Sequence, residues 1–272
     1  MTAQLRTVLA ALDARYDPAL AESWDAVGLV CGDPEEEVRR VLFAVDPTAA
    51  VVDEVIATGA QLLVTHHPLF LTPVHGVPAD DAKGRLVHRL VRAGAALFVA
   101  HTNADRAPGC GVNAALADVL GLRDAVPLEP VAGSPGAGLG RIGRLPEAVP
   151  LRRFAEHAAA VLPATAGGLR VAGDPDREIR AVAVCGGSGG SLLGAAAAAG
   201  ADVLLTSDLK HHPVADAAEV PGPALCDVAH AASEWPWLPV AADVLRRDLD
   251  DRVETAVFSR STDPWVFRAG QG

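Results

Sequence analysis

The chain has 272 residues, a formal net charge of −11, and 50% hydrophobic residues. It is long enough for one large domain or two small ones. The acidic balance argues against nucleic-acid binding, which depends on clustered Lys and Arg. Four scattered cysteines without a CxxC pair argue against a zinc ribbon or a disulfide framework. No apolar stretch reaches membrane-spanning length, and the first residues do not resemble a signal peptide. We therefore expect a cytoplasmic protein without membrane attachment.

The first half of the chain predicts helices alternating with strands. A short amphipathic helix over residues 1–12 comes first. The following elements are strands over 37–44, 62–65 and 95–100, a helix over 48–58 between the first two strands, and a helix ending at 117–120. Such alternation is typical of βαβ units with parallel strands.

The second half predicts a similar series. Strands are expected over 178–185, 203–206 and 223–226, with a helix over 191–199. A glycine-rich segment over 131–140 is a linker, a mobile lid or the entry of a bent strand. A second glycine-rich turn, 186–191, precedes a helix. It favours a tight turn, with an anion cradle as the alternative.

The two halves contain a diverged internal repeat. An offset of 141 positions aligns 38 with 179, and it also aligns the segment 59–65 with 200–206. We therefore expect an α/β fold of two similar lobes with mixed, largely parallel sheets and a metal cleft between them. The first lobe is expected over 1–125, with 226–272 packing back on it. The second is expected over 126–225.

Adjacent histidines follow the strand at 62–65. Pro68 prevents the strand from continuing, so His66 and His67 lie at its carboxyl end, where open α/β sheets bind ligands. Neighbouring side chains of an extended chain point to opposite sides, so the two imidazoles can reach two different centres. The plainer interpretation is a pair of polar residues capping a strand.

Other predicted strands are also followed by metal-ligand side chains. His101 and Asp105 follow one strand, and the segment 230–234 follows another, with His230 and Glu234 one helical turn apart. His211 and His212 come a few residues after a third. Imidazole and carboxylate groups together are the ligands of Zn, Fe, Mn and Ni. These segments favour metal binding over simple capping.

Five ordered motifs resemble those of a known family. They are ESWDAVGL (22–29), THHP (65–68), HTNAD (101–105), SDLKHH (207–212) and HAASE (230–234). This series resembles the YbgI-type, Nif3-like dinuclear-metal proteins, catalogued as GTP cyclohydrolase I type 2 homologues. The resemblance covers about residues 5–268. It implies two α/β lobes, a two-metal centre in their cleft and a ring-shaped homohexamer. Relatives with an extra domain in the middle exist, but this chain is too short between its lobes to contain one.

The resemblance also assigns roles to residues. It implies two divalent ions per subunit, of Zn, Fe, Mn, Co or Ni. It assigns the two histidines of the second His-His pair, His211 and His212, to substrate contact or proton transfer. Ser207-Asp208 replaces a more common Gly-Glu, and Ala231 replaces a frequent aromatic residue. The implied metal ligands are His66, His67, Asp105, His230 and Glu234.

Three functions follow from these motifs. The first is a metal-dependent hydrolase in which a metal-bound hydroxide attacks a purine nucleotide or related small molecule, as the family name GTP cyclohydrolase suggests. The second is a non-catalytic metal-binding hexamer that serves as a scaffold or regulator. The third is a metal-dependent phosphoesterase. Abundant apolar residues with only 4% aromatics add a modest argument for a homo-oligomer with apolar interfaces. For Trp24 and Asp25 we favour aromatic packing and turn capping over a role at the cleft entrance.

Overall fold

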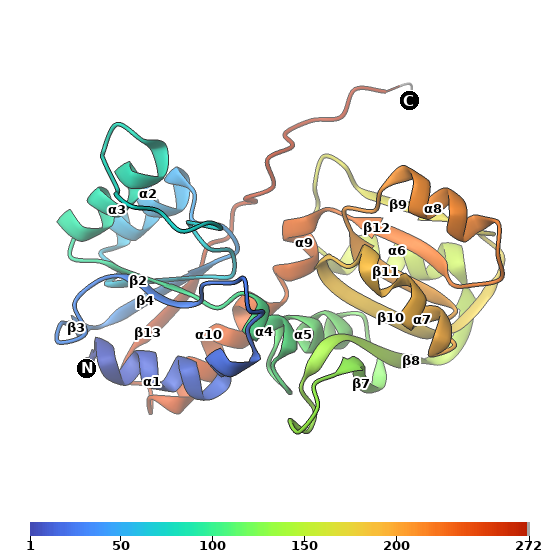
Figure 1. Cartoon of the computed structure of the whole chain (residues 1–272), viewed down its shortest axis with the longest axis horizontal. Helices are drawn as coiled ribbons and strands as arrows, with labels where there is room; N and C mark the ends of the chain where they lie inside the picture. Colours follow the sequence, from blue (N-terminus) through green and yellow to red (C-terminus); the bar gives the residue numbers. More distant parts are fainter. Residues whose placement is uncertain (271–272) are drawn as a thin grey trace. The chain divides into compact units, whose positions relative to one another are not determined.

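The computed structural model describes residues 1–270, which form two compact units (Figure 1). The first unit consists of residues 1–110 and 238–262. The second consists of 111–237 and the C-terminal residues from Asp263 onward. Both units are mixed α/β structures, as the sequence predicted. In the described residues, no helix is both long and apolar enough to cross a bilayer.

The first unit is built on a five-stranded sheet in the order β13-β4-β5-β6-β2, beside a two-stranded sheet of β1 and β3. Strands β13, β4, β5 and β6 are parallel neighbours, and β2 is antiparallel at the edge. This sheet is therefore largely parallel. Its elements are β1 (Ala3–Gln4), α1 (Leu5–Arg15), β2 (Gly28–Cys31), β3 (Glu37–Val38), β4 (Arg40–Ala44), α2 (Ala49–Thr58), β5 (Leu62–Thr65), α3 (Ala82–Arg92), β6 (Ala96–Val99), α4 (Thr102–Arg106), most of α10 (Trp237–Asp248) and β13 (Glu254–Val257).

The second unit is built on a six-stranded sheet in the order β7-β8-β10-β11-β12-β9. Its central strands β10, β11 and β12 are parallel, and the outer strands are antiparallel. Its elements are α5 (Val112–Val119), β7 (Arg123–Pro130), β8 (Gly138–Pro150), α6 (Leu151–Val161), β9 (Leu169–Ala172), β10 (Glu178–Ser188), α7 (Leu193–Ala198), β11 (Val203–Ser207), α8 (His211–Ala218), β12 (Ala224–Val228) and α9 (His230–Glu234).

The two sheets have the same register at their centres. Val41 pairs with Leu62 between β4 and β5. Val182 pairs with Val203 between β10 and β11, which places both partners 141 positions further along the chain. In each unit a helix connects the paired strands. The strand pairing thus follows the offset found in the sequence.

Local sequence explains where these elements begin and end. The Thr48 hydroxyl accepts a hydrogen bond from the backbone N–H of Val51 and so caps the start of α2. Gly59, in the left-handed conformation at φ 62°, ends that helix. All four residues of β5 are buried, as expected for a strand covered on both faces.

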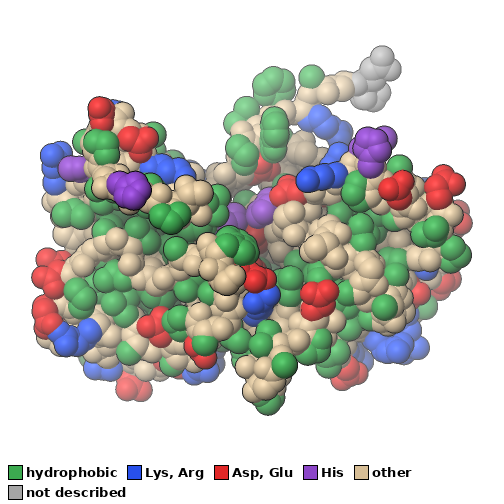
Figure 2. Space-filling model, in the orientation of Figure 1, with side chains coloured by type: hydrophobic (Ala, Val, Ile, Leu, Met, Phe, Trp, Pro, Cys, Tyr) green, Lys and Arg blue, Asp and Glu red, His purple; other side chains and the backbone are tan. Residues whose placement is uncertain are grey.

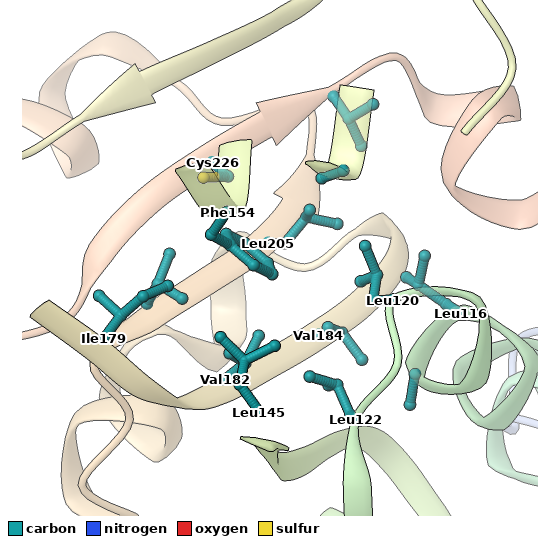
Figure 3. Close-up of a cluster of buried hydrophobic side chains, with 14 of the residues drawn as sticks. Leu116, Leu120, Leu122, Leu145, Phe154, Ile179, Val182, Val184, Leu205 and Cys226 are labelled. Atoms are coloured by element: carbon teal, nitrogen blue, oxygen red, sulfur yellow. The ribbon is translucent and has the colours of Figure 1, made fainter. Parts of the chain in front are cut away.

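The core of each unit forms where helices cover the sheet. In the second unit, Phe154 of α6 packs with Val182, Val184 and Leu205 from the sheet. Figure 3 shows these side chains together with Leu116 of α5. Because α5 contributes to this core, the second unit begins at residue 111.

The unit boundaries therefore differ from the lobes expected from the sequence, 1–125 with 226–272 and 126–225. The strand β12 and the helix α9 belong to the second unit, and only 238–262 joins the first.

On the face drawn in Figure 2, Lys and Arg side chains are dispersed among acidic and hydrophobic ones.

Candidate metal centre

In the first unit, polar residues follow three parallel strands where each strand ends. Asp46 follows β4, His66 and His67 follow β5, and His101 follows β6. Parallel neighbours bring these carboxyl ends to one edge of the sheet, the edge at which open α/β sheets bind ligands. The fold therefore gathers residues that lie far apart in the sequence.

His66, His67 and His101 form a compact cluster, called here the three-histidine cluster. One ring nitrogen of each lies within 4.8 Å of one ring nitrogen of the other two. The ring centroids of His66 and His101 are 5.2 Å apart. On α4, Asp105 places Oδ1 3.6 Å from Nε2 of His66. The predicted ligands His66, His67 and Asp105 thus lie together, and His101 joins them.

Each imidazole of this cluster is held through Nδ1. Nδ1 of His66 donates to the carbonyl oxygen of Ala100 at 2.9 Å, and Nδ1 of His67 donates to Oδ1 of Asp46 at 2.6 Å. Nδ1 of His101 lies 3.0 Å from both carboxylate oxygens of Asp25. An acceptor at Nδ1 selects the tautomer in which Nε2 carries the lone pair. This arrangement is typical of metal-binding histidines.

Asp25 has a more specific role than the turn cap favoured from the sequence. Its Oδ2 accepts hydrogen bonds from the Thr102 hydroxyl at 2.6 Å and from the Thr102 backbone N–H at 3.1 Å. Burial acts to raise the pKa of Asp25, but the hydrogen bonds from Thr102 and His101 outweigh it and lower the pKa. Asp25 is therefore a charged acceptor that orients His101. Trp24 is 60% exposed, so it is not the packed aromatic that we expected.

His101 is adapted to remain a neutral imidazole. Burial and the proximity of His66 lower its pKa, although Asp25 acts in the opposite direction. A neutral imidazole is the form that binds metal ions.

The second unit presents another pair, called here the His230–Glu234 pair. Both residues lie on α9, and Nε2 of His230 is 2.9 Å from Oε1 of Glu234, as their spacing of four residues predicts. The Glu234 side chain is only 2% exposed. Nδ1 of His230 donates to Oδ2 of Asp208 at 2.6 Å, which repeats the histidine–carboxylate pattern of the first unit.

Asp208 has an unusual backbone conformation. Its φ is 56°, in the left-handed region that costs most residues energy but that Asp adopts more readily than others. This conformation turns the chain directly after β11. Strained backbone that persists at such a point is typical of functional sites.

The glycine-rich segment 186–190, which contains the end of β10 and the start of a 3-10 turn, is fixed by side chains of its own unit. The backbone N–H of Gly186 donates to Asn113, that of Gly187 to Ser233, and that of Gly189 to Thr206, each at 2.8 Å. Because these N–H groups already donate to protein side chains, the geometry argues against the anion cradle. Instead of one tight turn, the segment continues β10 to Ser188, and a 3-10 turn begins at Gly190.

His211 and His212 occupy the first turn of α8. Their ring centroids are 5.3 Å apart, and both residues are exposed. They come three and four residues after Asp208.

Comparison with known proteins identifies the family. The model of Duf34/NIF3 (NGG1p interacting factor 3) matches residues 3–264. The chain belongs to the Duf34/NIF3 family. A "GTP cyclohydrolase 1 type 2 homolog" from Streptomyces coelicolor is 50% identical over 97% of this chain and 94% of the relative. A protein of the same name from Mycobacterium tuberculosis is 38% identical, and its alignment spans 371 positions with 97% of each chain covered. That length exceeds the 272 residues here, so the mycobacterial relative contains inserted sequence.

Solved structures of Duf34/NIF3 relatives agree with the fold. A Bacillus cereus protein related to NIF3 has a TM-score of 0.88 at 25% identity, covering 98% of this chain and 99% of that one. Staphylococcus aureus protein SA1388 gives the same TM-score at 27% identity, covering 97% and 99%. HcgD from Methanocaldococcus jannaschii gives 0.78 at 26% identity, covering 96% and 99%.

The sequence of this Duf34/NIF3 chain did not show how four residues beside the predicted ligands act. His101 was counted among the metal-ligand side chains but not assigned as a ligand, although its spacing of four from Asp105 matches that of His230 and Glu234. The carboxylates Asp25, Asp46 and Asp208 orient imidazoles across 76, 21 and 22 residues, respectively. No local pattern signals such pairings, because tertiary structure creates them.

Proposed function

We propose that this protein is a dinuclear metal-dependent hydrolase that acts on a small molecule, with a purine nucleotide as the favoured substrate class. The proposed ligands of two divalent ions are His66, His67, Asp105, His230 and Glu234. The first three belong to the first unit and the last two to the second.

The observation that carries the proposal is the shared state of four imidazoles. Nδ1 of His66, His67, His101 and His230 faces an oxygen acceptor in each case, which leaves Nε2 as the ring nitrogen for a metal ion. Nε2 of His66 lies 3.6 Å from a carboxylate oxygen of Asp105, and Nε2 of His230 lies 2.9 Å from one of Glu234, so nitrogen and carboxylate donors are adjacent in each unit. Nitrogen and carboxylate donors of this kind fit Zn, Fe, Mn, Co or Ni. A purely structural cluster would not require the same tautomer at every histidine.

Different residues of the chain have different proposed roles. Divalent ions bound to this donor set would polarise a substrate and make water a nucleophile near neutral pH. The orienting carboxylates Asp25, Asp46 and Asp208 hold the imidazoles in position. We assign His211 and His212 to substrate contact and proton transfer, because both are exposed imidazoles and imidazole is the side chain that most often transfers protons in catalysis.

Metal analysis followed by a substrate panel tests the proposal. We expect two ions per chain in protein reconstituted with Zn, Mn, Fe, Co or Ni, and one ion or none would remove the dinuclear model. Purine nucleotides and phosphoesters are then compared. Formate release supports a cyclohydrolase, phosphate release supports a phosphoesterase, and tight metal binding without turnover of any compound supports a scaffold.

Replacing His212 with Ala is expected to leave the metal content unchanged and to abolish most turnover. The residue is exposed on α8, and its proposed role is proton transfer, which typically contributes about 10²–10⁴-fold to a rate. Elemental analysis and initial rates provide the measurement. His157→Ala, an exposed histidine on α6 of the same unit, is the matched control and should change neither. Loss of metal in His212→Ala would place the residue among the ligands instead.

We also propose that the protein assembles as a homohexamer. The family resemblance and the apolar composition support this assembly. Light scattering at micromolar concentration should give six times the chain mass of 27.9 kDa. A mass near 27.9 kDa would refute assembly, and a dimer would refute the ring.

A further inference from the structure

The segment after the last strand of the first unit runs along the edge that carries the three-histidine cluster. Beyond β13, the backbone N–H of Phe258 donates to the carbonyl oxygen of Phe43 at 2.8 Å, which continues the pairing with β4. Phe258 is buried in the core of the unit. The Arg260 guanidinium lies 4.9 Å from the Phe258 ring centroid and 3.6 Å from Oε2 of Glu54 on α2. Residues 258–262, called here the C-terminal strap, are therefore anchored.

The strap ends on a carboxylate that orients a proposed metal ligand. The Thr262 hydroxyl donates to Oδ2 of Asp46, and Oδ1 of the same carboxylate accepts from Nδ1 of His67. These three residues are all partly buried. The hydroxyl therefore holds the oxygen that the imidazole does not use and limits rotation of the carboxylate.

The same arrangement occurs a second time in the unit. The Thr102 hydroxyl donates to Asp25, and Asp25 accepts from Nδ1 of His101. Thr102 is the neighbour of His101 in sequence, whereas Thr262 lies 216 residues from Asp46. Two threonine–aspartate–histidine chains thus converge on one cluster, although their threonines come from unrelated parts of the sequence.

We infer that Thr262 is a positioning residue for the metal centre and that the C-terminal strap is a working part of the site. The inference rests on the proposed function, because it takes His67 as a ligand. Through Asp46, Thr262 limits the rotation of His67 and holds the proton on Nδ1, so that Nε2 would be the nitrogen that binds an ion. Groups one step behind a metal ligand typically contribute about 10–100-fold to metal affinity.

The test compares Thr262→Val, which removes the hydroxyl at constant shape, with Thr262→Ser, which retains it. Thr255→Val in β13 is the matched control for hydroxyl loss in the same part of the chain. We expect Thr262→Val to weaken Co²⁺ binding about 10-fold or more and to alter the visible spectrum of the bound ion. Thr262→Ser and Thr255→Val should behave like the wild type. Wild-type affinity and spectrum in Thr262→Val, or failure of Thr262→Ser to restore them, would overturn the inference.

An NMR measurement on the metal-free protein tests this inference independently of the proposed function. In the metal-free protein, the His67 Nδ1–H should give a downfield NMR signal protected from solvent exchange, assigned by its loss in His67→Gln. Thr262→Val should accelerate that exchange while thermal unfolding shows a folded protein. If the wild type binds no metal but this signal responds as described, the proposed metal centre is refuted, whereas the Thr262–Asp46–His67 hydrogen-bond chain is supported. If the wild type binds metal and the signal does not respond, the strap has no positioning role.

Discussion

Glu234→Gln is expected to reduce bound metal from two ions per chain to one or none, and to abolish turnover. The substitution keeps the shape of the side chain but removes its charge and one anionic ligand atom 2.9 Å from His230 Nε2. Substituting a residue that hydrogen-bonds to a metal ligand typically weakens metal affinity roughly 10–100-fold, and we expect a larger loss of metal affinity when the ligand itself is changed. Elemental analysis after dialysis against a weak chelator provides the measurement.

The stability of the metal-free variant separates a ligand from a structural carboxylate. Glu234 is 2% exposed, and a buried carboxylate carries a large desolvation cost. We therefore expect chelator-treated Glu234→Gln to resist urea at least as well as chelator-treated wild type. Glu219→Gln, at the exposed end of α8, is the matched control and should leave metal content and stability unchanged. A large stability loss in metal-free Glu234→Gln would show that Glu234 serves the fold instead.

Gly187→Ala is expected to destabilise the second unit and to disturb the His230–Glu234 pair. Gly187 has φ 67°, and a Cβ atom there would lie 2.5 Å from Oε1 of Glu234 and 3.1 Å from Nε2 of His230. The backbone conformation alone costs about 1–2 kcal/mol for a residue with a side chain. The contact with two proposed ligand atoms adds to this cost. Urea unfolding and metal titration measure both effects.

Gly194→Ala is the matched control for this glycine substitution. Gly194 lies within α7, and a Cβ atom there would meet nothing within 4 Å. Alanine in a helix interior stabilises a protein by about 0.5–1 kcal/mol relative to glycine. The two substitutions should therefore change stability in opposite directions. Equal stability of Gly187→Ala and wild type, with equal metal affinity, would show that the turn can move without affecting the pair.

The sequence predicted the central strands well because their residues are apolar on both faces. The strand expected over 62–65 matches β5, and that over 203–206 lies within β11. Each strand is part of a contiguous apolar run. Of the alternatives for the glycine-rich segment 131–140, the bent strand entry agrees with β8, which starts at Gly138. The antiparallel pairing of β7 with β8 was not foreseen, because 131–140 carried no strand alternation.

The candidate site was predictable only in part, because sequence motifs do not show which distant residues orient the site's side chains. His66, His67, Asp105, His230 and Glu234 lie in short motifs that follow predicted strands, and the structure groups the first three in one unit and the last two in the other. Their hydrogen-bond partners are distant in sequence, as the separation of 216 residues between Asp46 and Thr262 illustrates. The spacing of a motif indicates which side chains are neighbours along one strand or helix. The orientation of each imidazole depends instead on which strand ends lie side by side in the folded protein.

The placement of β13 determines the order in which the units can be completed during synthesis. The first unit needs 238–262 to close the β4 edge of its sheet, whereas the main body of the second is the continuous stretch 111–237. A ribosome therefore releases every strand of the second unit's sheet before the last strand of the first. Until then, the β4 edge has no parallel neighbour on that side and must be protected from other strands. The histidines of the three-histidine cluster, at positions 66, 67 and 101, are thus synthesised well before residues 258–262, which complete their support.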